Sequence, residues 1–207
     1  MLSIACAWVF LAIADEVPEQ GRMSGVDTTT VAWLQTHGTE SGESIFNRVG
    51  WLGAHGLTAI VVVLAVAFLA RRSWRRFALV TIVYAGSVGL NQLLKAMFHR
   101  ERPAAATEFV SSGSFSFPSG HAMESIAVYG ALAYLIVERF PASRYVAWLG
   151  WLGLAGIIGF SRVYLGVHYA SDVAAGFAAG FVWLFTCVTG YRFAEREPIA
   201  EKSLRRP

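Results

Sequence analysis

Apolar runs long enough to cross a lipid bilayer recur along the chain, and short polar segments separate them. A transmembrane helix needs about 20 apolar residues, with a range of roughly 17–25. The runs that approach this length are Trp51–Ala70, Phe77–Leu94, Ala122–Val137, Tyr145–Phe160 and Asp172–Tyr191. The fourth run is short and is bounded by arginines. The pattern predicts a membrane-spanning helix for each of these runs.

Two further segments near the N-terminus complete the predicted fold. Met1–Ala14 is apolar but short and lacks a basic leader, so it is either a span or the apolar part of a signal peptide. We favour a span because no small-x-small cleavage site follows before Asp15. Val26–Gly50 mixes polar and aromatic residues and predicts an outer loop with a short helix at the membrane interface. The expected fold is all-α, a polytopic membrane protein with a six-transmembrane-helix bundle.

Composition agrees with a chain surrounded by lipid. Of 207 residues, 55% are hydrophobic and 15% are charged, whereas soluble domains carry about 25% charged residues. The net charge is +3, but the basic residues flank the apolar runs, which argues against nucleic acid as a partner. Cys6 and Cys187 lie inside apolar stretches, so no disulfide framework is expected.

The loops differ in their content of lysine and arginine, which predicts orientation because such residues favour the cytoplasmic side. Eleven basic residues fall on one side, namely Arg71, Arg72, Arg75, Arg76, Arg139, Arg144, Arg192, Arg196, Lys202, Arg205 and Arg206. We therefore expect one integral-membrane domain over residues 1–207 in the cell inner (cytoplasmic) membrane, with a basic cytoplasmic tail at 192–207. The opposite loops then face the periplasm or the outside.

Small residues repeat in two of the predicted spans. Gly150, Gly153, Gly156 and Gly159 recur every three residues, and Gly176 and Gly180 form a small-xxx-small pair. Such residues let helix backbones approach closely in lipid, so both groups predict helix packing.

Three polar clusters fall on the predicted outer side. They are Lys95–Pro103, Pro118–His121 and Ser161–Asp172. Taken singly, each cluster has a structural explanation. Lys95 and Arg102 suit anchors whose charged ends reach the membrane surface, and Ser119 suits a helix cap. In the third cluster, His168 and Asp172 suit a polar pair on one helix face. Together they place three cations, two histidines and a carboxylate at one end of a bundle, which indicates a functional site.

The residue types in these clusters suit phosphate chemistry. The guanidinium groups of Arg102 and Arg162 match phosphate oxygens, Lys95 adds a third cation, and a helix start with Gly120 offers close backbone N–H groups. A carboxylate such as Asp172 fixes the tautomer of a histidine four residues away and makes its other nitrogen nucleophilic.

The same clusters supply an acid and leave no place for a metal. His121, on a separate helix, suits a general acid. No cluster has metal-ligand spacing, so neither a metal nor a cofactor is expected.

The order Lys-x6-Arg-Pro, Pro-Ser-Gly-His and Ser-Arg-x5-His-x3-Asp resembles the three-part signature of the type 2 phosphatidic acid phosphatase superfamily. This superfamily includes membrane lipid phosphatases, glucose-6-phosphatase and the vanadium haloperoxidases. All eleven signature positions match between Lys95 and Asp172. The resemblance also implies the six-span layout of the membrane branch.

The resemblance implies a phosphohistidine mechanism. His168 would attack phosphorus, Asp172 would orient it, and His121 would protonate the leaving oxygen and later activate water. The phosphoryl oxygens would be held by Lys95, Arg102, Arg162 and the Ser119–Gly120 backbone.

Glu124 and Ser161 have less defined roles than the signature residues. Ser161 is expected to support the residues that bind phosphate. Glu124 lies one helical turn below His121, where it either accepts a hydrogen bond from that ring or from a substrate hydroxyl, or is paired inside the bundle without catalytic duty.

The implied function is a metal-independent lipid phosphate or diphosphate phosphatase at the outer membrane face, with the bilayer and a lipid phosphate as its partners. The sequence does not choose among phosphatidylglycerophosphate, phosphatidate and undecaprenyl diphosphate, nor does it indicate an oligomeric state. Six spans disfavour a haloperoxidase. The alternative is a non-catalytic phospholipid-headgroup-binding or transport protein, which needs the cations but not both histidines.

Overall fold

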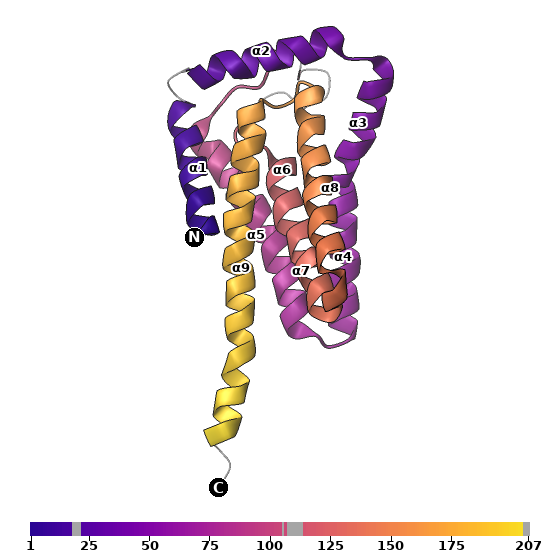
Figure 1. Ribbon diagram of the computed structural model, residues 1–207, viewed down its shortest axis with the longest axis vertical. Helices are drawn as coiled ribbons and strands as arrows, with labels where there is room; N and C mark the ends of the chain where they lie inside the picture. The colour runs from indigo at the N-terminus through magenta and orange to yellow at the C-terminus, as the bar shows by residue number, and fades with distance from the viewer. Residues whose placement is uncertain (18–21, 105, 107–113, 205–207) are drawn as a thin grey trace.

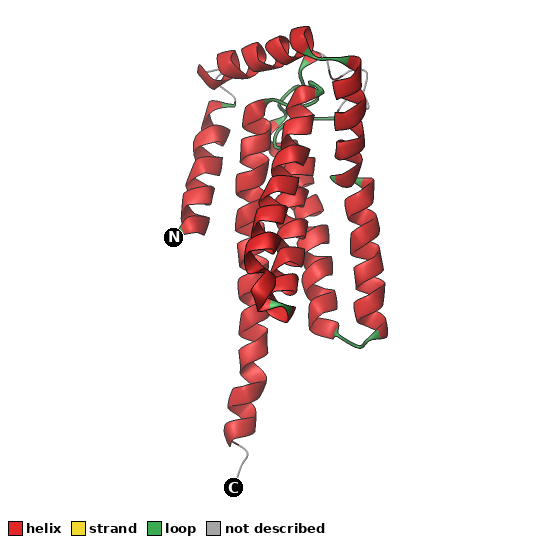
Figure 2. Ribbon diagram, turned by 45° about the vertical axis from the view of Figure 1, so that its right-hand side comes forward, coloured by secondary structure: helices red, strands yellow, loops and turns green. Residues whose placement is uncertain are grey.

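The computed structural model describes the backbone of residues 1–17, 22–104, 106 and 114–204, with side chains to Ala194 except that of Arg22. Every regular element in these ranges is a helix. Most helices stand side by side in an elongated bundle, and the last helix, α9 (Ala170–Leu204), extends beyond the others at one end (Figures 1 and 2).

Five helical segments are long and apolar enough to cross a membrane, and they contain all five apolar runs listed above. Segment Glu40–Ala70 contains α3 (Glu40–Leu52) and α4 (His55–Ala70), and Trp74–Phe98 is α5. The remaining three are Gly120–Arg139 with α6 (Gly120–Glu124) and α7 (Gly130–Arg139), Pro141–Tyr164 with α8 (Arg144–Tyr164), and Ala170–Ala194 within α9. A π-helical turn at Ser125–Tyr129 joins α6 to α7.

The apolar run at the N-terminus forms α1 (Leu2–Glu16), a helix of 15 residues. At 1.5 Å per residue it is about 22 Å long, shorter than the hydrocarbon core of about 30 Å. It is therefore not one of the five candidate spans. It lies beside α9 (Figure 1) and buries Ile13 and Ala14 against Phe117 and Ala175.

The predicted outer loop at 26–50 is mostly helical. Helix α2 (Arg22–His37) crosses the end of the bundle, roughly perpendicular to the other helices (Figures 1 and 2), and then α3 runs along α8. Thr39 begins α3 by accepting a 3.1 Å hydrogen bond from the Gly42 N–H. The few apolar residues of α3 suffice because Phe46 packs on Tyr164, with ring centroids 4.5 Å apart. The prediction of a loop is therefore wrong for residues 40–50, which belong to α3.

The glycine pattern predicts helix packing correctly in α9, but in α8 it does so only at Gly159. A Cβ added at Gly176 of α9 would lie 2.6 Å from the Ser119 carbonyl oxygen, and one at Gly180 would collide with the Met123 carbonyl. In α8, Gly159 packs on Phe177, but a Cβ at Gly150, Gly153 or Gly156 would meet no described atom within 4 Å. Spacing identifies a glycine face, but it does not say whether another helix covers that face.

The buried core lies in the middle of the bundle and includes Leu57, Val80, Val83, Ala127 and Ile158, each no more than 1% exposed. Above this core, the C-terminal ends of α5 and α8 meet the N-terminal ends of α6 and α9 beneath α2 (Figure 1). The topology thus brings the three polar clusters to one end of the molecule.

Candidate active site

The predicted site residues converge on one cavity of about 340 Å³ at this end of the bundle. Seven of the ten line it, namely Lys95, Arg102, Gly120, His121, Glu124, Arg162 and His168. The other three, Ser119, Ser161 and Asp172, are fully buried and contact lining residues or their neighbours. Segments far apart in sequence therefore form a single site.

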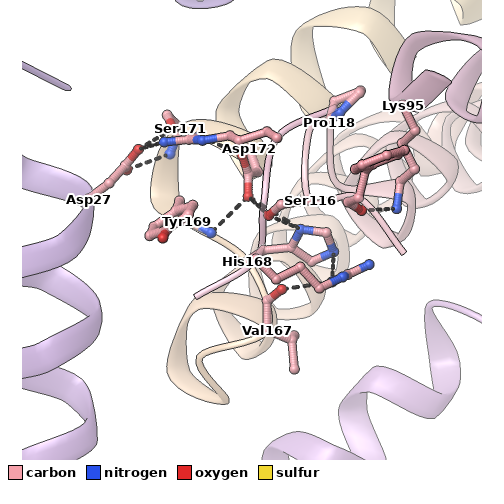
Figure 3. Close-up of polar contacts among 12 residues, drawn as sticks. Asp27, Lys95, Ser116, Pro118, Val167, His168, Tyr169, Ser171 and Asp172 are labelled. Carbon is pink, nitrogen blue, oxygen red and sulfur yellow. Dashed lines mark hydrogen bonds and ion pairs between the residues drawn. The ribbon is translucent and has the colours of Figure 1, made fainter. Parts of the chain in front are cut away.

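His168 lies in the loop between α8 and α9 and is 3% exposed. Its Nδ1 is 3.4 Å from Asp172 Oδ2, and its Nε2 is 3.3 Å from Arg102 Nη1 (Figure 3). Burial lowers the pKa of His168 to about 4, although the Asp172 carboxylate acts in the opposite direction. The ring is therefore neutral at pH 7, and with Nδ1–H directed at Asp172 the lone pair of Nε2 faces the cavity, where it accepts from Arg102 Nη1.

Asp172 receives hydrogen bonds from several sides. Its Oδ1 accepts a 2.6 Å bond from Arg100 Nη1, and its Oδ2 accepts a 2.9 Å bond from the Tyr169 N–H and a short bond from Ser116 Oγ. A fully buried carboxylate is stable as an anion only with such partners. Asp172 is therefore held in one position beside His168.

Arg100 connects this carboxylate to α2. Its Nη2 is 2.8 Å from Asp27 Oδ2, while Asp27 also accepts a 3.0 Å bond from the Ser171 N–H and a bond from Ser171 Oγ (Figure 3). Burial disfavours the charge on Arg100, but Asp172 and Asp27 outweigh it and raise the pKa of its guanidinium. The chain Asp27–Arg100–Asp172–His168 fixes the histidine to the helix above it.

The sequence did not identify these supporting residues. Arg100 occupies one of the six unspecified positions of the first motif, and Asp27 and Ser116 belong to no motif. The one signal in the sequence is that Arg100 stands two residues from Arg102. A second cation so close to the site indicates an anionic partner, because a buried cation requires one.

The three cavity cations bind neutral oxygens. Within the described part of the chain, no carboxylate forms an ion pair with Lys95, Arg102 or Arg162. Their positive charge is therefore available to an anion, and their positions are set before it binds. The carbonyls that hold them belong to Phe115 for Lys95 (2.9 Å), Val167 for Arg102 (2.7 Å) and Phe46 for Arg162 (3.3 Å).

The start of α6 differs from expectation. Ser119 is the N-cap residue of α6, but its side chain makes no capping hydrogen bond. Its N–H donates a 3.0 Å bond to the Asp172 carbonyl, so this backbone donor is already engaged. Its buried Oγ has no hydrogen-bond partner among the described residues, which is costly unless a ligand oxygen supplies one. A Cβ at Gly120 would lie 3.0 Å from Asn91 Oδ1, so the absence of a side chain lets the cavity wall close here.

His121 and Glu124 line the cavity together from successive turns, as their spacing predicted. Ser161 Oγ accepts a 3.0 Å bond from Arg162 Nε and donates a 2.6 Å bond to the Ile158 carbonyl, so it orients that guanidinium. The structure leaves the role of Glu124 as a prediction.

Comparison with known proteins identifies the family. Residues 77–196 match the family model of the PAP2 superfamily. The chain is 38% identical over 152 residues to phosphatidylglycerophosphatase B of Bacillus subtilis (strain 168), covering 71% of this chain and 73% of that protein. It is 38% identical over 109 residues to the lipid A 1-phosphatase of Rhizobium etli, covering 48% and 43%.

A solved structure has the same fold over nearly the whole length. The crystal structure of a transmembrane PAP2-type phosphatidylglycerolphosphate phosphatase from Bacillus subtilis superposes with a TM-score of 0.84 at 27% identity, covering 94% of this chain and 98% of that one. With the signature residues gathered in one cavity, the chain belongs to the PAP2 superfamily, in its membrane lipid phosphatase branch.

Proposed function

We propose that this membrane lipid phosphatase removes a terminal phosphate through a phosphohistidine intermediate on His168. The observation that carries the proposal is the position of His168. Its Nδ1 faces Asp172, and its Nε2 lies in a cavity with three cations that pair with no described carboxylate. A headgroup-binding protein would need the cations but not this oriented histidine.

The reaction has two steps in which each bond and proton is accounted for. In the first, His168 Nε2 forms a bond to phosphorus as the bond to the leaving oxygen breaks, and His121, which enters this step as an imidazolium beside the anionic phosphate, gives that oxygen its proton and becomes neutral. In the second, His121 takes a proton from water, the resulting hydroxide attacks phosphorus, and the N–P bond breaks to release phosphate. Asp172 stabilises the positive charge that His168 carries between the steps.

The phosphoryl oxygens need donors that are already in place when charge develops. Lys95, Arg102 and Arg162 supply these, together with backbone N–H groups in the first turn of α6. Ser119 Oγ is a further donor, because the hydroxyl is buried without a described partner. We assign Ser119 this role through its side chain, since its N–H already bonds Asp172.

The substrate is a lipid phosphate or diphosphate. Of three candidates, we rank phosphatidylglycerophosphate above phosphatidate and undecaprenyl diphosphate. The similarity to phosphatidylglycerophosphatase B supports this order. We also propose that α1 is a sixth membrane-embedded helix, that α2 lies at the interface, and that the cavity opens to the periplasm or outside from the inner membrane.

Replacement of the nucleophile tests the mechanism. We expect His168→Ala to lower phosphate release by at least about a thousandfold, whereas His37→Ala, an exposed histidine on α2, should retain activity. Wild-type enzyme quenched in alkali during turnover should carry an acid-labile phosphohistidine that His168→Ala lacks. Near-normal turnover by His168→Ala would exclude the proposed intermediate.

A further inference from the structure

A second cavity, of about 580 Å³, adjoins the catalytic one. The two share four lining residues, namely Asn47, Ala54, His121 and Arg162. His121, the proposed general acid, therefore lies at the boundary between the two cavities. Its remaining wall comes from the end of α3 and the start of α4.

The last turns of α3 lie directly against the catalytic residues. A Cβ at Gly53 would be 2.9 Å from His121 Cδ2, and a Cβ at Gly50 would collide with the Arg162 guanidinium. These glycines let the helix approach closely, so that Arg48 and Trp51 of the same helix line the second cavity. Arg48, His121 and Arg162 thus line the same cavity.

The charge of this second cavity has one sign. Its lining includes two arginines, Arg48 and Arg162, and two histidines, His55 and His121, but no carboxylate. No described residue forms an ion pair or hydrogen bond with the Arg48 side chain. A cation without a partner beside a catalytic centre is suited to an anionic part of the substrate.

Reaction geometry says which part of the substrate reaches this cavity. In a displacement at phosphorus, the attacking and leaving atoms lie roughly in line. If His168 attacks and His121 protonates the leaving oxygen, the leaving group lies on the His121 side, which is where the second cavity opens.

We propose that Arg48 and His55 bind a second phosphate, the one that the leaving group retains. This inference rests on the proposed function. It favours lipid diphosphates and phosphatidylglycerophosphate, whose leaving groups are a lipid monophosphate and a phosphodiester, over phosphatidate, whose leaving group is neutral. Arg48 is in this sense a specificity-determining residue.

The test compares two lipids with the same acyl chains, phosphatidylglycerophosphate and phosphatidate, in mixed micelles. We expect Arg48→Gln to lower the ratio of their kcat/KM values by about tenfold, the loss of one charge-assisted hydrogen bond to phosphate. Arg48→Lys should restore part of the ratio. The matched control is Arg144→Gln, an exposed arginine at the start of α8, which should leave the ratio as in the wild type.

Product inhibition gives an independent readout. Phosphatidylglycerol should inhibit the wild type, and Arg48→Gln should weaken this inhibition by a similar factor. An unchanged ratio in Arg48→Gln, whether both rates fall equally or neither falls, would overturn the second phosphate site. A wild type that releases phosphate from neither lipid, nor from undecaprenyl diphosphate, would instead contradict the proposed function.

Discussion

Asp172 is the residue on which the geometry of His168 depends. It is fully buried, and its carboxylate receives bonds from Arg100, Ser116 and the Tyr169 N–H in addition to facing His168. Because both oxygens are engaged by fixed donors, the carboxylate has little freedom to rotate. The imidazole is thus oriented before a substrate arrives, which removes an entropic cost from the reaction.

The titration of His168 gives a prediction for acid pH. The ring must be neutral to attack, and burial has lowered its pKa from an ordinary value near 6.5 to about 4. Protonation of His168 should therefore reduce kcat/KM only below about pH 4. The measurement is kcat/KM against pH, corrected for the second ionisation of the substrate phosphate near about pH 6. An acid limb near about pH 6.5 after this correction would show an unperturbed histidine as nucleophile.

A single methyl group tests how tightly α3 packs on the site. A Cβ at Gly53 would be 2.9 Å from His121 Cδ2 and 2.7 Å from Ile158 Cγ2, so Gly53→Ala must displace both side chains or move its own backbone away from them. We expect turnover to fall by about tenfold or more, since small misplacements of catalytic groups are costly. Gly150→Ala is the matched control, because a Cβ there meets no described atom within 4 Å. Equal activity of the two variants would mean that α3 does not position His121.

At the scale of elements, α2 is more than a cover across the bundle end. It places Asp27, which is 1% exposed, against Arg100 and the first turn of α9. Arg100 then bridges two carboxylates, one on α2 and one on α9 (Figure 3). The outer helix is thereby coupled to the orientation of the catalytic histidine.

Removal of one charge from this bridge gives the next prediction. Asp27→Asn keeps the size of the side chain but leaves Arg100 with Asp172 as its one anionic partner among the described residues. We expect kcat to fall by about tenfold with little change in KM, because Asp27 positions Asp172 and does not touch substrate. Loss of a buried ion-pair partner should also lower the melting temperature.

The control for this variant is Arg76→Gln, which breaks the Arg76–Glu138 pair of 3.0 Å at the far end of the bundle. That pair is partly exposed, so its loss should cost about 0–1 kcal/mol and leave kcat unchanged. If Asp27→Asn changed KM and left kcat unaltered, α2 would act on substrate binding and the positioning role would be wrong.

The sequence predicts an element correctly where a single local property, such as the length of an apolar run, determines it. Apolar run length located all five candidate spans, and the motif spacing named the residues that line the cavity. Helix α3 was missed because its apolar residues are few and its stability depends on contacts such as Phe46 with Tyr164. The Asp27–Arg100 pair joins residues 73 positions apart, so only the assembled helices reveal it.

The two ends of the molecule differ: the candidate active site lies at one end, and the basic loops lie at the other. The α4–α5 and α7–α8 connections lie at the end opposite α2 (Figure 1), where the pair Arg76–Glu138 joins the start of α5 to the end of α7. Helix α9 also runs from the cavity to that end. Six of the eleven basic residues counted above therefore lie in or beside these two connections, far from the site.

This asymmetry predicts which side of the membrane receives the phosphate. If the basic end is cytoplasmic, α2 and the cavity face outside. In a chain with Cys6 and Cys187 replaced by alanine, a cysteine at the exposed Thr36 of α2 should react with a membrane-impermeant thiol reagent in intact cells. A cysteine at Ser143, in the α7–α8 connection, should react only after lysis. Position Thr107, between the first two motifs, lies outside the described residues and is a weaker choice. The opposite labelling pattern would place the cavity in the cytoplasm, and the phosphate would then be released there.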